Sequence, residues 1–181
     1  MYIPTTTLTQ QGTPNLVYDQ TLAVAAASFD TTGTSLSGFR NLLLCGDFRT
    51  ETGSNTRAAI MQFNGDTGAN YDVSYIQVNN TTVTGTLTQG GASIPTGLVI
   101  PSDATANYFG SMQCLIVDYA NTTRFKDVQF IATAVHNTAA QVFTRTGGGV
   151  WKNTAAITRV VLGEGVVNYA VGSRLMIYGL Q

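Results

Sequence analysis

Residues 168–181, NYAVGSRLMIYGLQ, decide the fold. Their apolar, β-branched and aromatic residues predict a β-strand that continues almost to the last residue. Such a strand must pair within a sheet, because an unpaired terminal strand frays and exposes its backbone donors and acceptors. Most of the preceding sequence repeats this pattern of short apolar segments separated by Thr, Gly and Asn. We therefore expect an all-β protein.

The composition also favours strands over helices. Charged residues make up 10% of the 181 residues, well below the usual share of about 25%. Lysine occurs only at positions 126 and 152, and glutamate only at 51 and 164. Long straight-chain residues build most surface helices, so their scarcity argues against amphipathic helices. A chain of this length fits one domain with a core that needs no disulfide or metal.

The charge distribution narrows the classes of partner. The net charge is -1, and no segment gathers Lys and Arg. This absence argues against nucleic-acid binding and against a polybasic membrane anchor. The first residues, MYIPTTT, lack the pattern of a signal peptide, and no window approaches 18 apolar residues. We expect synthesis in the cytoplasm, and a weakly charged surface that permits association with other proteins.

Residues 42–48 carry a clear period of two. Leu42, Leu44 and Phe48 fall on one face, and Leu43 and Cys45 fall on the other. Because both faces are partly apolar, this strand is predicted to be central and covered on both sides.

Similar segments recur along the chain. Strands are expected at residues 58–63, 71–78, 81–88, 108–118, 125–134 and 157–162, with Gly147–Gly149 as a hairpin tip between 142–143 and 150–151. The prolines in residues 94–101 indicate an edge or irregular segment, and residues 22–27 fit either a short helix or a first strand. The spacing predicts a two-sheet antiparallel β-sandwich of jelly-roll type over residues 21–181. Residues 1–20, rich in Thr, Gln and Pro, are predicted to form an extended arm.

Few residues are suited to chemistry. His136 is the only histidine, so a Ser-His-Asp triad would have to include it; we interpret it as a polar residue at a strand end. Cys45 and Cys114 lie in apolar strand patterns and are expected to be buried thiols, with a disulfide between neighbouring strands as the alternative. One histidine and two separated cysteines do not make a structural zinc site. We predict no catalytic, cofactor-binding or metal-binding residue.

Three weaker patterns leave alternatives open. Asp66 lies in the loop NGDTG, which lacks the repeated acids of a helix-flanked calcium loop. A buried Arg–Asp pair is possible among Asp118, Asp127, Arg49 and Arg174, but it would be architectural. Eight tyrosines and Trp151 either line a sugar-binding groove or pack against the sheets, and we favour packing. The tyrosines are Tyr2, Tyr18, Tyr71, Tyr75, Tyr108, Tyr119, Tyr169 and Tyr178.

Four phrases occur in a recognisable order: FNGDTGANY (63–71), IVDYANTTRFK (116–126), WKNTAAITRV (151–160), and NYAVGS with IYG (168–179). Together they resemble a β-sandwich module of tailed-bacteriophage virion proteins, over about residues 29–181. That module forms the last domain of minor tail or fibre proteins, or a stand-alone capsid decoration protein. The resemblance implies a homotrimer and transfers no catalytic motif. The lack of a long upstream shaft favours decoration.

These observations together predict a non-enzymatic phage virion protein. The expected role is a capsid decoration, or cement, protein that binds the major capsid protein and stabilises the head. The arm, residues 1–20, would grip a neighbouring subunit by strand addition. The alternatives are a receptor- or glycan-binding module of the tail and, more remotely, a hydrolase that uses scattered acids.

Overall fold

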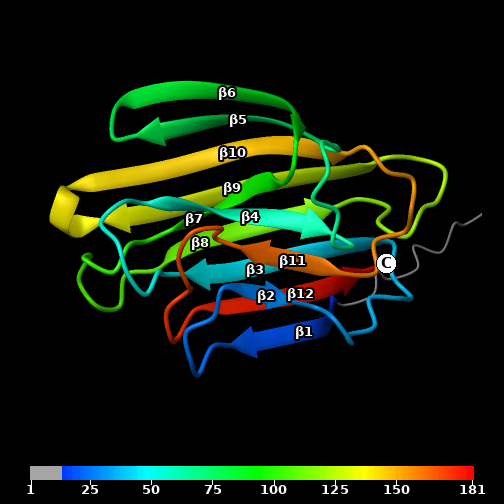
Figure 1. Ribbon diagram of the computed structural model, residues 1–181, viewed down its shortest axis with the longest axis horizontal. Coiled ribbons are helices and arrows are strands. Elements are labelled where there is room, and N and C mark those ends of the chain that lie inside the picture. The colour runs from blue at the N-terminus through cyan, green and yellow to red at the C-terminus, as the bar shows by residue number, and fades with distance from the viewer. Residues whose placement is uncertain (1–13) are drawn as a thin grey trace, which may run out of the picture.

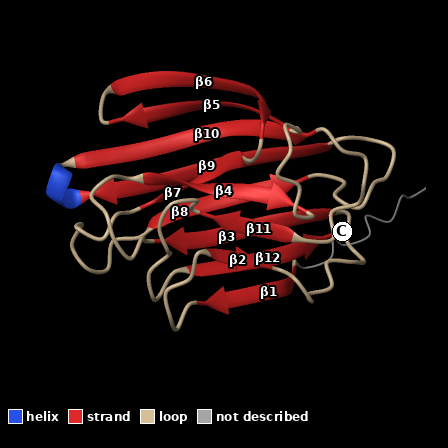
Figure 2. Cartoon of the chain, in the orientation of Figure 1, coloured by secondary structure: helices blue, strands red, loops and turns tan. Residues whose placement is uncertain are grey.

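The computed structural model describes residues 14–181 and is built almost entirely of strands. Twelve strands and one short 3-10 turn, η1 (Asn137–Ala139), make up the regular structure of these residues, and Figure 2 shows η1 as the single helical segment drawn. The strands form two antiparallel sheets, of eight and four strands, that pack face to face (Figure 1). The predicted all-β, two-sheet sandwich is confirmed.

The large sheet forms one layer of the sandwich. Its order is β1 (Asn15–Thr21), β12 (Arg174–Leu180), β3 (Asn41–Phe48), β8 (Gly110–Ile116), β9 (Lys126–His136), β10 (Gln141–Trp151), β5 (Tyr71–Asn79) and β6 (Thr82–Gly91). The small sheet has the order β2 (Ser28–Asp30), β11 (Val160–Gly163), β4 (Arg57–Phe63) and β7 (Ile94–Val99). In Figure 1 the small sheet lies in front of one face of the large sheet, and β5 and β6 extend beyond it.

The core lies between the two sheets, because every second side chain of a strand points toward the opposite sheet. Along β9 buried and exposed residues alternate without exception from Lys126 to His136, because successive side chains point to opposite faces of a strand. Aromatic side chains form much of the interior. Phe48 and Tyr169, for example, lie 5.4 Å apart between ring centroids. At the other end of the core Trp151 packs against Phe63 at 5.6 Å.

Two strand predictions need correction. Gly147–Gly149 is not a hairpin tip but the middle of β10, a strand paired on both sides. At Gly147 a Cβ would collide with the backbone of β5 at Ser74 and Tyr75, so glycine is there for close strand approach and not for a turn. The hairpin between β9 and β10 turns instead at η1 and Ala140, which has a φ of 52°.

The third strand, β3, is central as predicted, but it is covered on one face only. Its Leu42, Leu44 and Phe48 are fully buried against the small sheet, whereas Leu43 and Cys45 stay partly exposed on the other face. Within residues 14–181 the prediction of cover on both sides is therefore wrong. The apolar pattern of the second face remains without a packing partner among residues 14–181.

The sandwich takes in part of the segment predicted as an arm. Residues 15–20 are extended, but they form the edge strand β1 paired with β12. Val17 and Tyr18 pack against the core, which anchors the strand; the rest of the predicted arm, residues 1–13, lies outside the described residues. Residues 22–27 are neither helix nor strand, apart from one bridge from Ala26 to Tyr169. The segment with prolines forms β7, an edge strand with a register shift opposite Ala59, as predicted.

Candidate interaction surface

The face of the large sheet that points away from the small sheet is open and nearly uncharged. We call it the open face and define it by two neighbouring rows of cross-strand partners. The first row is Tyr178, Leu43, Leu115, Gln129, Gly148, Ser74 and Leu87, and the second is Met176, Cys45, Gln113, Ile131, Thr146, Ile76 and Gly85. None of these residues carries a charge, across seven adjacent strands.

Large apolar side chains on this face remain accessible to solvent. Ile131 in the middle of the sheet is 49% exposed, and Leu87 on β6 is 70% exposed. Single exposed apolar residues are ordinary, but a shared face that gathers several of them marks a candidate interaction site. The nearest charges lie in the rows on either side: Asp47 with Arg174 in one row, and Asp127 with Asp72 in the other.

The size of the whole outward side of the large sheet, which includes the open face and the charged rows on either side of it, suits a protein partner. Seven strands spaced by about 4.8 Å span roughly 29 Å, and the outward residues of β9 from Asp127 to Val135 span about 27 Å. The product, about 800 Å², matches the area that each partner contributes to a standard protein–protein interface. Asp127 and Val135 both lie on this side of β9.

Small side chains leave hollows in this surface. One hollow of about 500 Å³ is lined by Ser74, Leu87, Gln129 and Gly148 of the open face, and by Asp72 and Asp127 beside it. Two more residues of the face, Gly85 and Thr146, are also small. Side chains of a partner can fill such hollows, which gives an interface the close packing it needs.

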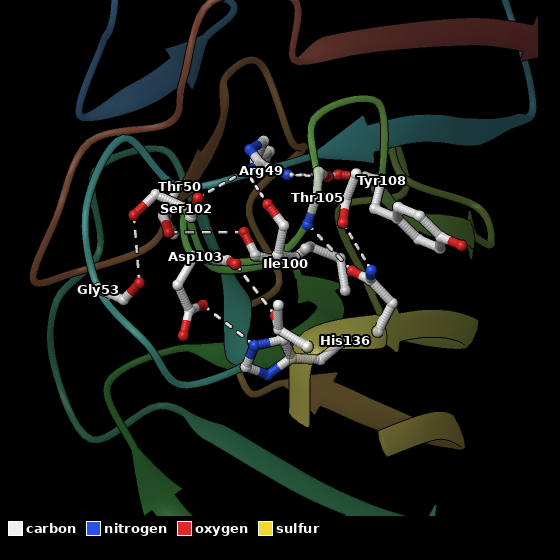
Figure 3. Close-up of polar contacts among 12 residues, drawn as sticks. Arg49, Thr50, Gly53, Ile100, Ser102, Asp103, Thr105, Tyr108 and His136 are labelled. Atoms are coloured by element: carbon white, nitrogen blue, oxygen red, sulfur yellow. Dashed lines mark hydrogen bonds and ion pairs between the residues drawn. The ribbon is translucent and has the colours of Figure 1, made fainter. Parts of the chain in front are cut away.

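Polar side chains at one end of the sandwich hold a loop in place (Figure 3). The guanidinium of Arg49 donates hydrogen bonds to four carbonyl oxygens of the segment after β7, including those of Ser102 at 2.7 Å and Thr105 at 3.0 Å. Thr105 is also bonded through its amide and hydroxyl to the side chain of Asn137. Arg49 thus acts in architecture, as a donor to backbone oxygens, and has no acidic partner in the described chain.

His136 lies beside this loop and is buried, with 2% of its surface exposed. Its Nε2 is 3.0 Å from Asp103 Oδ1 (Figure 3). The angles are not those of a hydrogen bond, and neither ring nitrogen has a hydrogen-bond partner in residues 14–181. No serine hydroxyl therefore contacts His136 in the manner of a nucleophile, and the described residues do not assemble a Ser-His-Asp triad.

Asp66 is occupied by donors of the protein itself. Its carboxylate accepts hydrogen bonds from Trp151 Nε1 at 2.7 Å, from the Gly68 amide at 2.9 Å and from Asn70 Nδ2 at 2.9 Å. The bond from the indole contributes most to holding the pKa of Asp66 below its usual value. The described part of the chain contains no group of three or more His, Cys, Asp or Glu placed to hold a metal ion.

The ion pairs differ from those considered in the sequence. Arg174 pairs with Asp19 of β1 at 2.7 Å, near the surface, and Asp118 pairs with the exposed Arg40. The buried acid is Glu164, whose side chain is 1% exposed and lies 3.3 Å from Arg57 Nε. No sequence pattern distinguished this pair, because its members come from distant loop and strand positions.

Lys126 is a second buried charge that the sequence analysis missed. It is fully buried, and its ammonium donates to the carbonyl oxygens of Arg124 at 2.8 Å and Thr154 at 3.2 Å. Burial lowers its pKa. The signal was present, because Lys126 shares the inward face of β9 with Val128 and Phe130.

The tyrosines and cysteines occupy mostly structural positions. Tyr71, Tyr119 and Tyr169 are buried in the core, so they do not line a sugar groove, and Tyr2 lies outside the described residues. The two cysteines are free, which rules out the disulfide alternative. Cys114 is buried as predicted, whereas Cys45 lies on the open face and is only partly buried.

Comparison with protein-family models found no matching family, and comparisons with curated proteins and with solved structures found no matching protein. Within residues 14–181 there is also no helix with the length and hydrophobicity to cross a membrane.

Proposed function

We propose that this chain is a non-enzymatic structural protein of a tailed-phage virion, and specifically a capsid decoration protein that binds the major capsid protein. The observation that carries the proposal is the open face. It is uncharged and partly apolar, it borders a hollow, and the outward side of the large sheet to which it belongs is about as large as one side of a standard interface. A surface of this kind fits a protein whose work is to dock on another protein.

The order of the strands supports the expected jelly roll. In an eight-stranded jelly roll, strands 1, 8, 3 and 6 form one sheet and strands 2, 7, 4 and 5 form the other. We set β1 and β12 aside and count β8, β9 and β10 together as one strand position, so that β2 to β11 fill eight positions. The small sheet β2-β11-β4-β7 then follows the order 1-8-3-6. In the large sheet, β3, the combined position β8-β9-β10, β5 and β6 follow the order 2-7-4-5.

Docking by the open face gives a simple mechanism for stabilising a head. A protein that binds the assembled shell, and not its separated subunits, favours the assembled state by mass action. In this proposal one sandwich bridges neighbouring capsid subunits and resists the outward pressure of the packaged genome. In this proposal residues 1–13, the part of the predicted arm outside the described residues, bind a neighbouring subunit and add a second contact.

The trimer remains part of the proposal. Its support is the resemblance of the four sequence phrases to virion modules, many of which are trimeric. Light scattering on the purified protein measures the mass directly. A mass of three chains, or of a multiple of three, is the expected result, and a strict monomer at all concentrations would remove the trimer from the proposal.

The location in the virion tests the function. Purified particles are labelled with gold-conjugated antibodies against this chain and imaged by electron microscopy. Label spread over the head is the expected result. Label found only on the tail would refute the capsid assignment and favour the alternative of a tail-associated receptor- or glycan-binding module, whereas unlabelled particles would refute a virion role.

A further inference from the structure

The edge strand β6 is long and uncharged, and its first seven residues pair regularly with β5. It has ten residues, TVTGTLTQGG, and all except Thr86 and Gly91 are exposed. None is charged and none is proline. Figure 1 shows β6 at the outer rim of the large sheet, beyond the cover of the small sheet. Long uncharged edge strands offer unpaired backbone groups to another strand.

The other three edges are each interrupted. β1 follows Pro14, shifts register after Leu16 and carries the ion-paired Asp19. β2 has only three residues. β7 contains Pro95 and a register shift. These are devices by which proteins prevent edge-to-edge association. In β6 the register shifts only beyond Thr88, so residues 82–88 pair regularly with β5 and form an uninterrupted edge without charge or proline.

We propose that β6 pairs with β6 of a second copy of this chain, antiparallel, across a two-fold axis at Gly85. In this register Val83 lies opposite Leu87 of the other copy, and Thr84 lies opposite Thr86. Alternate residues of an antiparallel strand direct their backbone N–H and C=O groups to opposite neighbours. Every second residue of β6 therefore has N–H and C=O groups that face away from β5 and can bond to another strand.

The sequence of β6 is complementary to itself in this register. Apolar Val83 meets apolar Leu87 on the side of the open face, and hydroxyls of Thr84 and Thr86 meet on the other side, both favourable cross-strand pairs. No like charges meet, because the strand has none. At the axis Gly85 has no side chain, and open space surrounds the position where a Cβ would be.

This contact joins two large sheets into one and makes the two open faces continuous. It is independent of the proposed role in a virion, because it needs only the chain itself. The contact has two-fold symmetry, so it does not itself build a trimer. A trimer formed through another surface would be joined by β6 to a second trimer.

Cysteine cross-linking tests the register. Thr84→Cys and Thr86→Cys proteins, both with Cys45→Ser, are purified separately, mixed and oxidised. The mixture is expected to give a disulfide-linked dimer, and each protein alone is expected to give far less. A mixture of Thr84→Cys with Gln20→Cys, at the opposite edge, is the matched control. No cross-link in the first mixture, or equal cross-linking in all samples, would overturn the proposal.

An edge charge tests the contact without cross-linking. Sedimentation velocity should show that Thr84→Lys weakens self-association at least tenfold, whereas Gln20→Lys on β1 leaves it unchanged. Both variants should keep a β-rich circular-dichroism spectrum, since both positions are exposed. Mixing Thr84→Lys with Thr86→Glu should restore association by opposite charges. Equal effects of the two lysines, or a wild-type protein that stays monomeric, would refute the pairing.

Discussion

Replacing Asp66 with alanine is predicted to destabilise the protein strongly, because one carboxylate organises a loop and part of the core. The indole of Trp151 is 1% exposed and donates to this carboxylate. Alanine leaves that buried N–H without an acceptor. It also removes the bonds from Gly68 and Asn70 that shape the loop.

The magnitude follows from these contacts. A hydrogen bond to a charged group contributes about 1.5–3 kcal/mol, and a buried donor left unpaired costs a similar amount. With the loss of the loop bonds, we expect Asp66→Ala to lower the free energy of unfolding by about 2–4 kcal/mol. Asp66→Asn keeps an acceptor and loses the charge, so a smaller loss of about 1–2 kcal/mol is expected.

Urea titration followed by tryptophan fluorescence measures these losses, because Trp151 is the only tryptophan. Asp127→Ala is the matched control. Asp127 is exposed on β9, and its replacement should change the free energy of unfolding by less than about 0.5 kcal/mol. The reasoning is refuted if Asp66→Ala matches this control. It is also refuted if calcium stabilises the wild type and not Asp66→Ala, which would reinstate the calcium-loop interpretation.

Three further predictions follow from positions in the core and its margins. Gly147→Ala should cost about 3 kcal/mol or more by forcing β5 away, whereas Gly85→Ala should be neutral or slightly stabilising; thermal melts compare them. Asp30 has a lowered pKa, chiefly because of the hydrogen bond from its ion-pair partner, so its contribution to stability is complete above about pH 4 and is lost as pH falls further. Acid titration of wild type against Asp30→Asn tests this sign, because the variant should lose less stability. A thiol reagent should modify Cys45 in the folded protein and Cys114 only after unfolding; equal rates would contradict the burial of Cys114.

Period-two patterns were enough to predict the layers of the fold. Leu42, Leu44 and Phe48 fall on one face of a strand with a period of two, and the structure buries all three. The glycine run at 147–149 led to the wrong prediction of a hairpin tip, because composition alone does not distinguish a turn from a close approach of two strands. That distinction depends on Ser74, a residue of a strand more than seventy positions earlier.

The sequence indicated that the candidate surface is apolar, but not what would cover it. Leu43 and Cys45 indicated a second apolar face on the third strand, and cover from the same chain was the natural expectation. Whether a second layer comes from the same chain or from another protein depends on how many strands each sheet receives. Strand order is set by long-range pairing, such as β10 with β5, which local patterns do not encode.

Binding to the phage head tests the central claim most directly. Heads that lack this protein are mixed with wild type, with Ile131→Asp on the open face, or with Val24→Asp, and the bound fraction is measured by co-sedimentation. Val24 is 73% exposed and lies outside the open face, so Val24→Asp should bind like wild type. Ile131→Asp should weaken binding at least tenfold while urea titration shows an intact fold. Wild-type binding by Ile131→Asp would contradict the claim that the open face is the docking surface.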